Sequence, residues 1–224
     1  MANTKNTQPS SMEETLNKSE AFVLKYQKPL LIALAAIIVI IAGAILVKNY
    51  VIEPRAEKAS TILAKGQEYF NAEDFDKALN GDKATFPGLI SVANDYSSTD
   101  AGNLAKLYCG LCYAQLGKYE DAEKYLTDWS PADDQMVSPA GIAALGNVYA
   151  HLNKLDKAVS SLKEAAKKAN NNSLSPTFLV QAGEILESQG KKDEALKLYK
   201  EVKEKYVNSM AYQDIDKYIE RVTE

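Results

Sequence analysis

The sequence contains one His, two Cys and one Trp among its 224 residues, and these scarcities exclude whole classes of function. Two Cys are too few for a disulfide-rich scaffold or for a four-thiolate zinc site. A single His excludes any catalytic or metal site that requires two. The formal net charge is −4, whereas nucleic-acid binders typically carry an excess of basic residues. We therefore expect no nucleic-acid partner.

No sequence motif indicates catalysis or a bound cofactor. The chain has no P-loop, no Gly-x-Ser-x-Gly, no His-Glu-x-x-His and no dinucleotide fingerprint. Cys109 and Cys112 have the spacing of a redox pair, but both fall in the middle of a predicted helix, whereas reactive pairs lie at a helix N-terminus. We expect both to be small buried residues, and His151 to lie on the surface or in a groove. The sequence therefore predicts no enzyme, no cofactor and no metal site.

Residues 30–47 form a long apolar run, LLIALAAIIVIIAGAILV. As an α-helix this run spans about 27 Å, close to the roughly 30 Å hydrocarbon core of a bilayer. Lys28 and Lys48 flank it where their amines can reach headgroups, and Tyr26 and Tyr50 flank it as interfacial aromatics. A core helix rarely stays apolar on every side for five turns. No A-x-A cleavage site follows, so the run predicts an uncleaved transmembrane anchor.

The charges beside the anchor do not decide its orientation. Three basic residues lie within fifteen positions on either side, so the positive-inside rule gives a tie. The part after Val47 carries 22 basic and 27 acidic residues, and an acidic domain is easily exported. We therefore expect a cytoplasmic N-terminus. Before the anchor, Ser11 and Glu14 form a possible capping box that opens either an amphipathic surface helix or a short helix leading into the span.

Three later segments align on one pattern of small and large residues. The aligned residues are Cys109-Gly110-x-x-Tyr113 with Ala122 and Leu126, Leu145-Gly146-x-x-Tyr149 with Ala158 and Leu162, and Ala182-Gly183-x-x-Leu186 with Ala195 and Tyr199. A weaker copy has Gly66, Tyr69 and Ala78, and it starts 44 residues before the next one. The first copy therefore contains an insertion, and the turns at Gly81 and Pro87-Gly88 should interrupt its second helix.

The pattern is typical of two helices that pack closely against each other. The small residue lets a second helix approach closely, and the larger residues fill the space between the two helices of a hairpin. Gly117, Asn153 and Gly190 stand between the helices, where a left-handed residue ends a helix. Ser138 and Ser175 each precede a Pro and are predicted N-caps of a first helix.

These copies resemble the tetratricopeptide repeat, a helix–turn–helix unit of about 34 residues. The resemblance covers about residues 56–208, although the usual Trp near the repeat start and Pro near its end are missing. It implies an all-α fold, with one N-terminal transmembrane helix followed by an α-solenoid of hairpins. The predicted layout is a tail at 1–29, the transmembrane helix at 30–47, a linker at 48–55, and a repeat domain at 56–224 with repeats at about 59–102, 103–138, 139–175 and 176–208 and a capping helix at 209–224.

Helical-repeat proteins usually bind partners on the concave face lined by the first helix of each hairpin. Placing the copies on the family pattern predicts a groove that is apolar at its membrane end and acidic at its far end, formed by Leu63, Phe70, Leu104, Leu107, Tyr108, Leu111, Asn147, His151, Glu184 and Glu187. One subclass of the family clamps a C-terminal carboxylate with charged residues, but the matching positions here are uncharged. The resemblance therefore implies an extended or helical apolar protein segment as the ligand.

The combination of a short tail, one anchor and a repeat domain is similar to the ancillary Sec translocon subunit family of bacteria. The similarity rests on this architecture and on the segment SEAFVLKYQKPLL at 19–31. It implies a single-pass inner-membrane protein with periplasmic repeats, which handles exported chains or recruits a chaperone to the translocon. The alternative is a structural organiser that tethers one envelope-assembly or cell-division partner. An unrecognised enzyme would need clustered carboxylates, such as Glu184 with Glu187.

Overall fold

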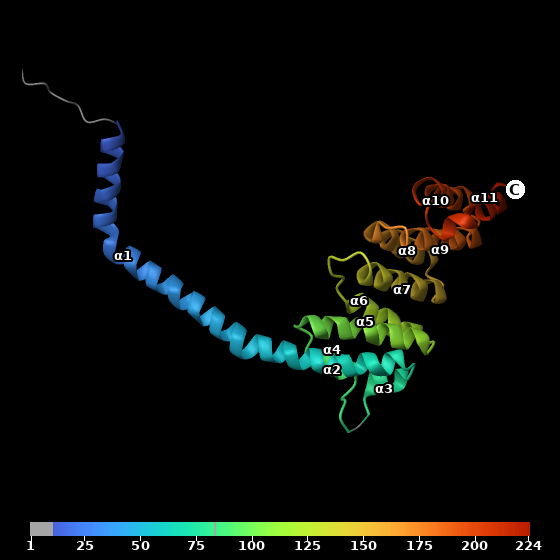
Figure 1. Ribbon diagram of the computed structural model, residues 1–224, viewed down its shortest axis with the longest axis horizontal. Coiled ribbons are helices and arrows are strands. Elements are labelled where there is room, and N and C mark those ends of the chain that lie inside the picture. The colour runs from blue at the N-terminus through green and yellow to red at the C-terminus, as the bar shows by residue number, and fades with distance from the viewer. Residues whose placement is uncertain (1–10, 83) are drawn as a thin grey trace, which may run out of the picture. The chain divides into compact units, whose positions relative to one another are not determined.

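The computed structural model describes residues 11–82 and 84–224, and the side chains of these from residue 25 onward. Every element assigned in these ranges is a helix and none is a strand, so the all-α prediction is confirmed. The chain divides into two units with the boundary between Pro54 and Arg55. Figure 1 labels the helices of both units.

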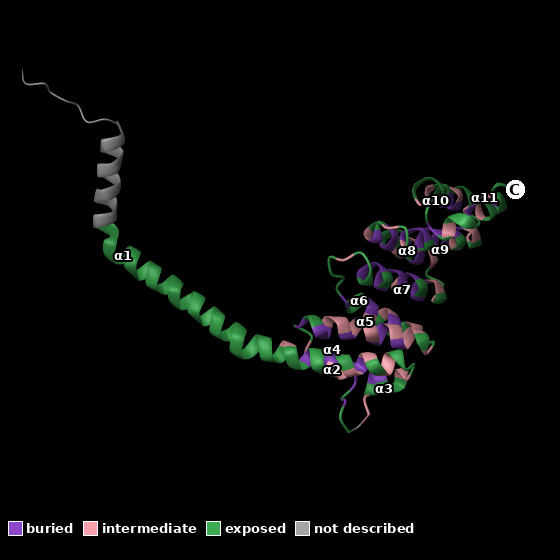
Figure 2. Cartoon of the chain, in the orientation of Figure 1, coloured by how far each residue is buried: buried purple, intermediate pink, exposed green. Residues whose placement is uncertain are grey.

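The first unit consists of α1 (Ser11–Val47) and a π-helical segment, η1 (Lys48–Ile52). All residues from 25 to 52 are exposed (Figure 2). The described residues include one helix that is long and apolar enough to cross a bilayer, judged by length and composition, and the mean hydropathy of its most apolar stretch is 3.3. The side chains of the predicted capping box, Ser11 and Glu14, lie outside the described residues.

The second unit is a series of helix hairpins. The first helices of the hairpins are α2 (Glu53–Asn71), α5 (Asp100–Gln115), α7 (Val137–His151) and α9 (Ser175–Ser188). The second helices are α3 (Phe75–Asn80) with α4 (Leu89–Asp95), α6 (Tyr119–Asp128), α8 (Leu155–Ala169) and α10 (Lys192–Lys205). The chain ends in a 3₁₀ turn, η2 (Ala211–Gln213), and in α11 (Ile215–Thr223).

The recurrent Gly of each later copy lies where the two helices of a hairpin touch. A Cβ added there would meet the second helix within 3.0 Å, the pairs being Gly110 with Leu126 at 2.5 Å, Gly146 with Leu162 at 3.0 Å and Gly183 with Tyr199 at 2.3 Å. In each pair the neighbour stands 16 residues after the Gly. The close approach predicted from the spacing is therefore confirmed.

The first hairpin reaches the same packing by a different route. A Cβ at Gly66 would lie 2.4 Å from Cδ2 of Leu89, which belongs to α4 and stands 23 residues later. The second helix is thus split, as the two turns predict, and α4 supplies the side chain that packs on the small residue. The left-handed turns at Gly117, Asn153 and Gly190 are also confirmed, with φ of 71°, 56° and 73°.

The predicted N-caps at Ser138 and Ser175 are wrong. α7 begins one residue before Ser138, and α9 begins at Ser175 itself. Asp134 instead caps α7, because its Oδ1 accepts the backbone N–H groups of Met136, Val137 and Ser138 at 2.6 to 3.1 Å. The Ser138 hydroxyl donates to the same carboxylate, and together these donors lower the pKa of Asp134 to about 2. A carboxylate with two acceptor oxygens satisfies more amides than one hydroxyl can.

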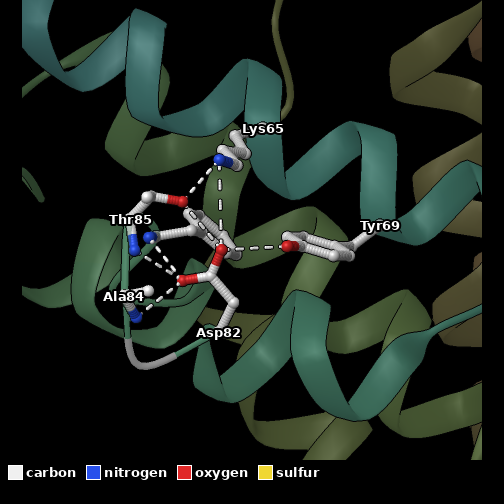
Figure 3. A network of polar contacts seen from close by, with 6 residues as sticks. Lys65, Tyr69, Asp82, Ala84 and Thr85 are labelled. Atoms are coloured by element: carbon white, nitrogen blue, oxygen red, sulfur yellow. Dashed lines mark hydrogen bonds and ion pairs between the residues drawn. The ribbon is translucent and has the colours of Figure 1, made fainter.

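The extra residues between α3 and α4 are organised by Asp82 (Figure 3). Its Oδ1 accepts the backbone N–H groups of Ala84, Thr85 and Phe86 at 2.7 to 3.0 Å, and the Tyr69 hydroxyl donates to its Oδ2 at 3.0 Å. These hydrogen bonds, led by the Thr85 and Phe86 amides, hold the pKa of Asp82 well below its usual range. The ionised carboxylate therefore ties the insertion to α2.

Replacing Asp82 by Asn is expected to lower the thermal unfolding temperature at pH 7, because the amide presents one acceptor oxygen in place of two. The folded-state pKa lies below the unfolded value of about 3.9, so the carboxylate stabilises the fold fully above about pH 4 and progressively less as pH falls towards the folded pKa. The difference in unfolding temperature between the wild type and the variant should therefore become smaller as the pH is lowered from 4 to 2.5, as measured in thermal scans. Asp133→Asn, at an exposed residue, is the control and should leave the unfolding temperature unchanged.

Candidate binding surface

One apolar hollow of about 330 Å³ brings together five of the ten predicted groove residues. We call it the apolar hollow; it is lined by residues of α2, α5 and the start of α7. The predicted residues that line it are Phe70, Leu104, Leu107, Tyr108 and Leu111. None of the residues that line it is charged.

Aromatic contacts shape one side of the apolar hollow. The rings of Phe70 and Tyr108 meet edge to face with centroids 5.1 Å apart, and the Phe75 ring also packs against Phe70, with centroids 5.6 Å apart. The Gln67 side-chain amide donates to the Tyr108 hydroxyl at 3.1 Å, which fixes that ring further. Leu107 is only 3 % exposed and forms the floor. The surface is thus shaped before any ligand arrives, which lowers the entropy lost on binding.

Met136 and Val137 complete the apolar hollow, and sequence reasoning missed both. They are 57 % and 53 % exposed, so both present apolar surface to solvent beside the apolar hollow. Their signal in the sequence is weak, because they form a short apolar pair between the polar residues 133–135 and the periodic apolar pattern of α7. Two adjacent apolar residues at the end of a polar loop are the feature of the sequence that could have indicated them.

Two asparagines hold the loop that carries Met136 and Val137. The Asn103 side chain exchanges two hydrogen bonds with the backbone of Ser130, at 2.7 and 2.9 Å. The Asn171 amide donates to the carbonyl of Gln135 at 3.1 Å. The loop is therefore anchored to α5 on one side and to the segment before α9 on the other.

The remaining predicted residues do not join the apolar hollow. Leu63 is 5 % exposed and belongs to the core. Asn147 and His151 are exposed, and the His151 ring stacks on Tyr119 with centroids 4.2 Å apart. Glu184 lines a separate hollow of about 410 Å³ with residues of the C-terminal segment, including Met210 and Asp214.

Glu187 is occupied by a contact within the chain. Arg221 of α11 donates to both of its carboxylate oxygens at 2.8 Å, and the Tyr199 hydroxyl also donates to it. Burial raises the pKa of Glu187, but the hydrogen bonds from Arg221 and Tyr199 outweigh burial and leave that pKa below its ordinary value. Glu187 thus ties the C-terminal helix to α9 and α10, and it is not a free partner for Glu184.

Cys109 and Cys112 are free thiols, both fully buried in α5, as the sequence predicts. Burial raises the pKa of Cys112 to about 12 and raises the pKa of Cys109 as well. Because the thiolate is the reactive form, neither residue is a nucleophile at neutral pH. In the described part of the chain, no three His, Cys, Asp or Glu side chains are grouped so that they could hold a metal ion.

Comparisons with known proteins identify the fold. Residues 20–217 match the model of the family described as tetratricopeptide repeat-like domain. No curated protein is significantly similar in sequence. A crystal structure of MamA protein superposes with a TM-score of 0.54 at 17 % identity, covering 75 % of this chain and 87 % of that one. A second crystal structure of MamA gives a TM-score of 0.49 at 19 % identity, covering 70 % and 92 %.

Proposed function

Because the chain belongs to the tetratricopeptide repeat-like family, we propose that it is a membrane-anchored scaffold that binds segments of other polypeptides and has no catalytic role. The binding site in this proposal is a groove formed by the first helices of the repeats. The observation that carries it is the apolar hollow, where uncharged side chains remain accessible beside a fixed aromatic wall. Accessible apolar surface of this kind is typical of sites that bind other proteins.

The charges along the first helices indicate the chemistry of the ligand. The apolar hollow has no charged lining residue, and the hollow further along carries the acidic Glu184 and Asp214. Asp214 is paired with Lys217 at 2.5 Å, which leaves Glu184 as the open carboxylate. A segment with a large apolar side chain and a neutral or basic continuation would complement this surface.

For location, we propose a bacterial inner-membrane protein with a cytoplasmic N-terminus and periplasmic repeats beside the Sec translocon. In that setting the groove would receive exported chains or recruit a chaperone. Support comes from the apolar run at 30–47, from the flanking Lys28 and Lys48, and from the similarity of 19–31 to the ancillary translocon subunits.

The alternative function, an organiser that tethers one fixed partner, has an observation of its own. Asn103 and Asn171 hold the loop that carries Met136 and Val137, so the rim of the apolar hollow is rigid. A rigid, preshaped rim suits one partner better than it suits many different unfolded chains.

A photo-reactive amino acid placed at Met136 in intact cells tests the groove and separates the two functions. Met136 is suitable because it is largely exposed, whereas a probe at the buried Leu107 would disturb the core. Capture of many exported chains supports the adaptor, and capture of one stoichiometric protein supports the organiser. Absence of any captured polypeptide would reject binding at the apolar hollow.

Val137→Asp should reduce this capture about tenfold, because an unpaired charge would be buried against the ligand. Val207→Asp is a matched control, since Val207 is 52 % exposed and does not line the apolar hollow. Equal capture by the two variants would show that the cross-links form by random collision, and would contradict binding at the apolar hollow.

A further inference from the structure

A second hollow lies between the second helices α8 and α10, with α9 beneath it. We call it the outer hollow; its volume is about 590 Å³. Its rim and floor include Lys163, Lys167, Lys205, Glu201, Leu179 and Leu198. From sequence alone, the mixed runs at 163–168 and 200–205 are typical of an ordinary solvated helix face. The fold instead brings three of their lysines to one cavity.

Two of these three lysines have no ionic partner within the described chain. The third, Lys205, forms an ion pair with Glu201 at 2.8 Å. Lys163 and Lys167 lie one turn apart on α8 and form no ion pair or hydrogen bond with any described residue. Glu164 also lines the outer hollow, but its carboxylate forms no ion pair with either amine. Like charges one turn apart repel each other, so these two amines would gain from an anionic ligand.

The floor of the outer hollow is apolar. Leu179 and Leu198 are 4 % and 7 % exposed, and Ala166 is 2 % exposed. A purely ionic ligand would leave this floor in contact with water, and a purely apolar ligand would bury the two amines without a partner. The ligand that satisfies both parts carries carboxylates and a large apolar side chain.

We propose that the outer hollow is a second binding site, separate from the apolar hollow, for an acidic polypeptide segment in extended conformation. Alternate side chains of an extended chain point the same way and stand about 7 Å apart. Side chains one helical turn apart have Cβ atoms about 5 to 6 Å apart. Two carboxylates at alternate positions can therefore reach Lys163 and Lys167 together, while a Leu two positions further on reaches the floor.

The test uses the full chain in phosphatidylcholine nanodiscs at low salt, with the fluorescein-labelled peptide SGESESLSG as the probe. Fluorescence anisotropy should show saturable binding that weakens as salt is added. Lys163→Gln with Lys167→Gln should weaken binding about fivefold, the effect of losing two partly screened ion pairs. Lys197→Gln with Lys200→Gln removes the same charge outside the outer hollow and should leave binding unchanged.

Two altered peptides test the parts of the site without changing the protein. Replacing the Leu of the probe by Ser should weaken binding, and replacing both Glu by Lys should abolish it. The double Arg variant, Lys163→Arg with Lys167→Arg, keeps both positive charges and should retain binding. Its binding would show that the weaker binding of the double Gln variant results from the lost charges and not from misfolding. No binding of the probe, equal loss in both lysine pairs, or equal binding of the Leu and Ser peptides would overturn the proposal. The Val137→Asp variant should bind the probe as tightly as the wild-type chain does, because the substitution alters only the apolar hollow.

Discussion

Replacing Gly183 by Ala is expected to lower the free energy of unfolding by about 2 kcal/mol. Overpacking at the upper end of its range costs about 3 kcal/mol, and the preference of a helix interior for Ala over Gly returns about 0.5–1 kcal/mol. The new Cβ would lie 2.3 Å from Cε1 of Tyr199 and within 2.8 Å of two more atoms of that side chain. The ring is fully buried, and its hydroxyl is held by Glu187, which is itself held by Arg221. Because the ring has nowhere to move, α9 and α10 must separate, and the contact that fastens α11 is strained as well.

Gly146→Ala is the matched control, because it changes the same position of the preceding repeat. Its Cβ would lie 3.0 Å from Cγ of Leu162, a smaller overlap than at Gly183. Ala also favours a helix interior over Gly by about 0.5–1 kcal/mol, so the two effects should nearly cancel. Urea unfolding of the full chain measures both variants, and equal losses at the two glycines would contradict the packing argument.

Deleting residues 30–47 is expected to move the chain from the membrane fraction to the soluble fraction almost completely. The run contains twelve Leu, Ile and Val residues, and each contributes roughly −0.3 to −0.6 kcal/mol to insertion, or roughly −4 to −7 kcal/mol together. Carbonate extraction of membranes followed by immunoblotting measures the distribution. A scrambled run of the same composition is the control and should stay in the membrane, because insertion depends on apolar content more than on order.

The same cells test orientation. Protease added to spheroplasts should digest the repeats of the wild-type chain and spare residues 1–29, since the repeats are proposed to face the periplasm. Protection of the repeats would contradict that placement. Retention of the deletion variant in extracted membranes would instead contradict the anchor itself, so the two outcomes separate the two proposals.

The hairpins and the apolar run could be predicted from sequence because their causes are local. A small residue such as Gly146 followed 16 positions later by Leu162 specifies a contact within one hairpin, and Asn153 marks the turn between its helices. The candidate site was predicted in part for the same reason. Phe70, Tyr108 and their neighbours occupy repeated positions on the first helices, and these converge on the apolar hollow.

What lay outside the repeat pattern was decided by tertiary packing alone. Leu89 of α4 packs on Gly66, where each later hairpin uses the residue 16 positions after its Gly, and Asp82 organises the insertion that precedes α4. Glu187 is tied to Arg221, 34 positions away, and Lys163 and Lys205 meet at one hollow from different helices. The repeat spacing does not encode such contacts, because each joins side chains that the repeat pattern does not pair. Sequence therefore determined the repeating units and the membrane-compatible run, and the tertiary structure decided which side chains remain free to bind.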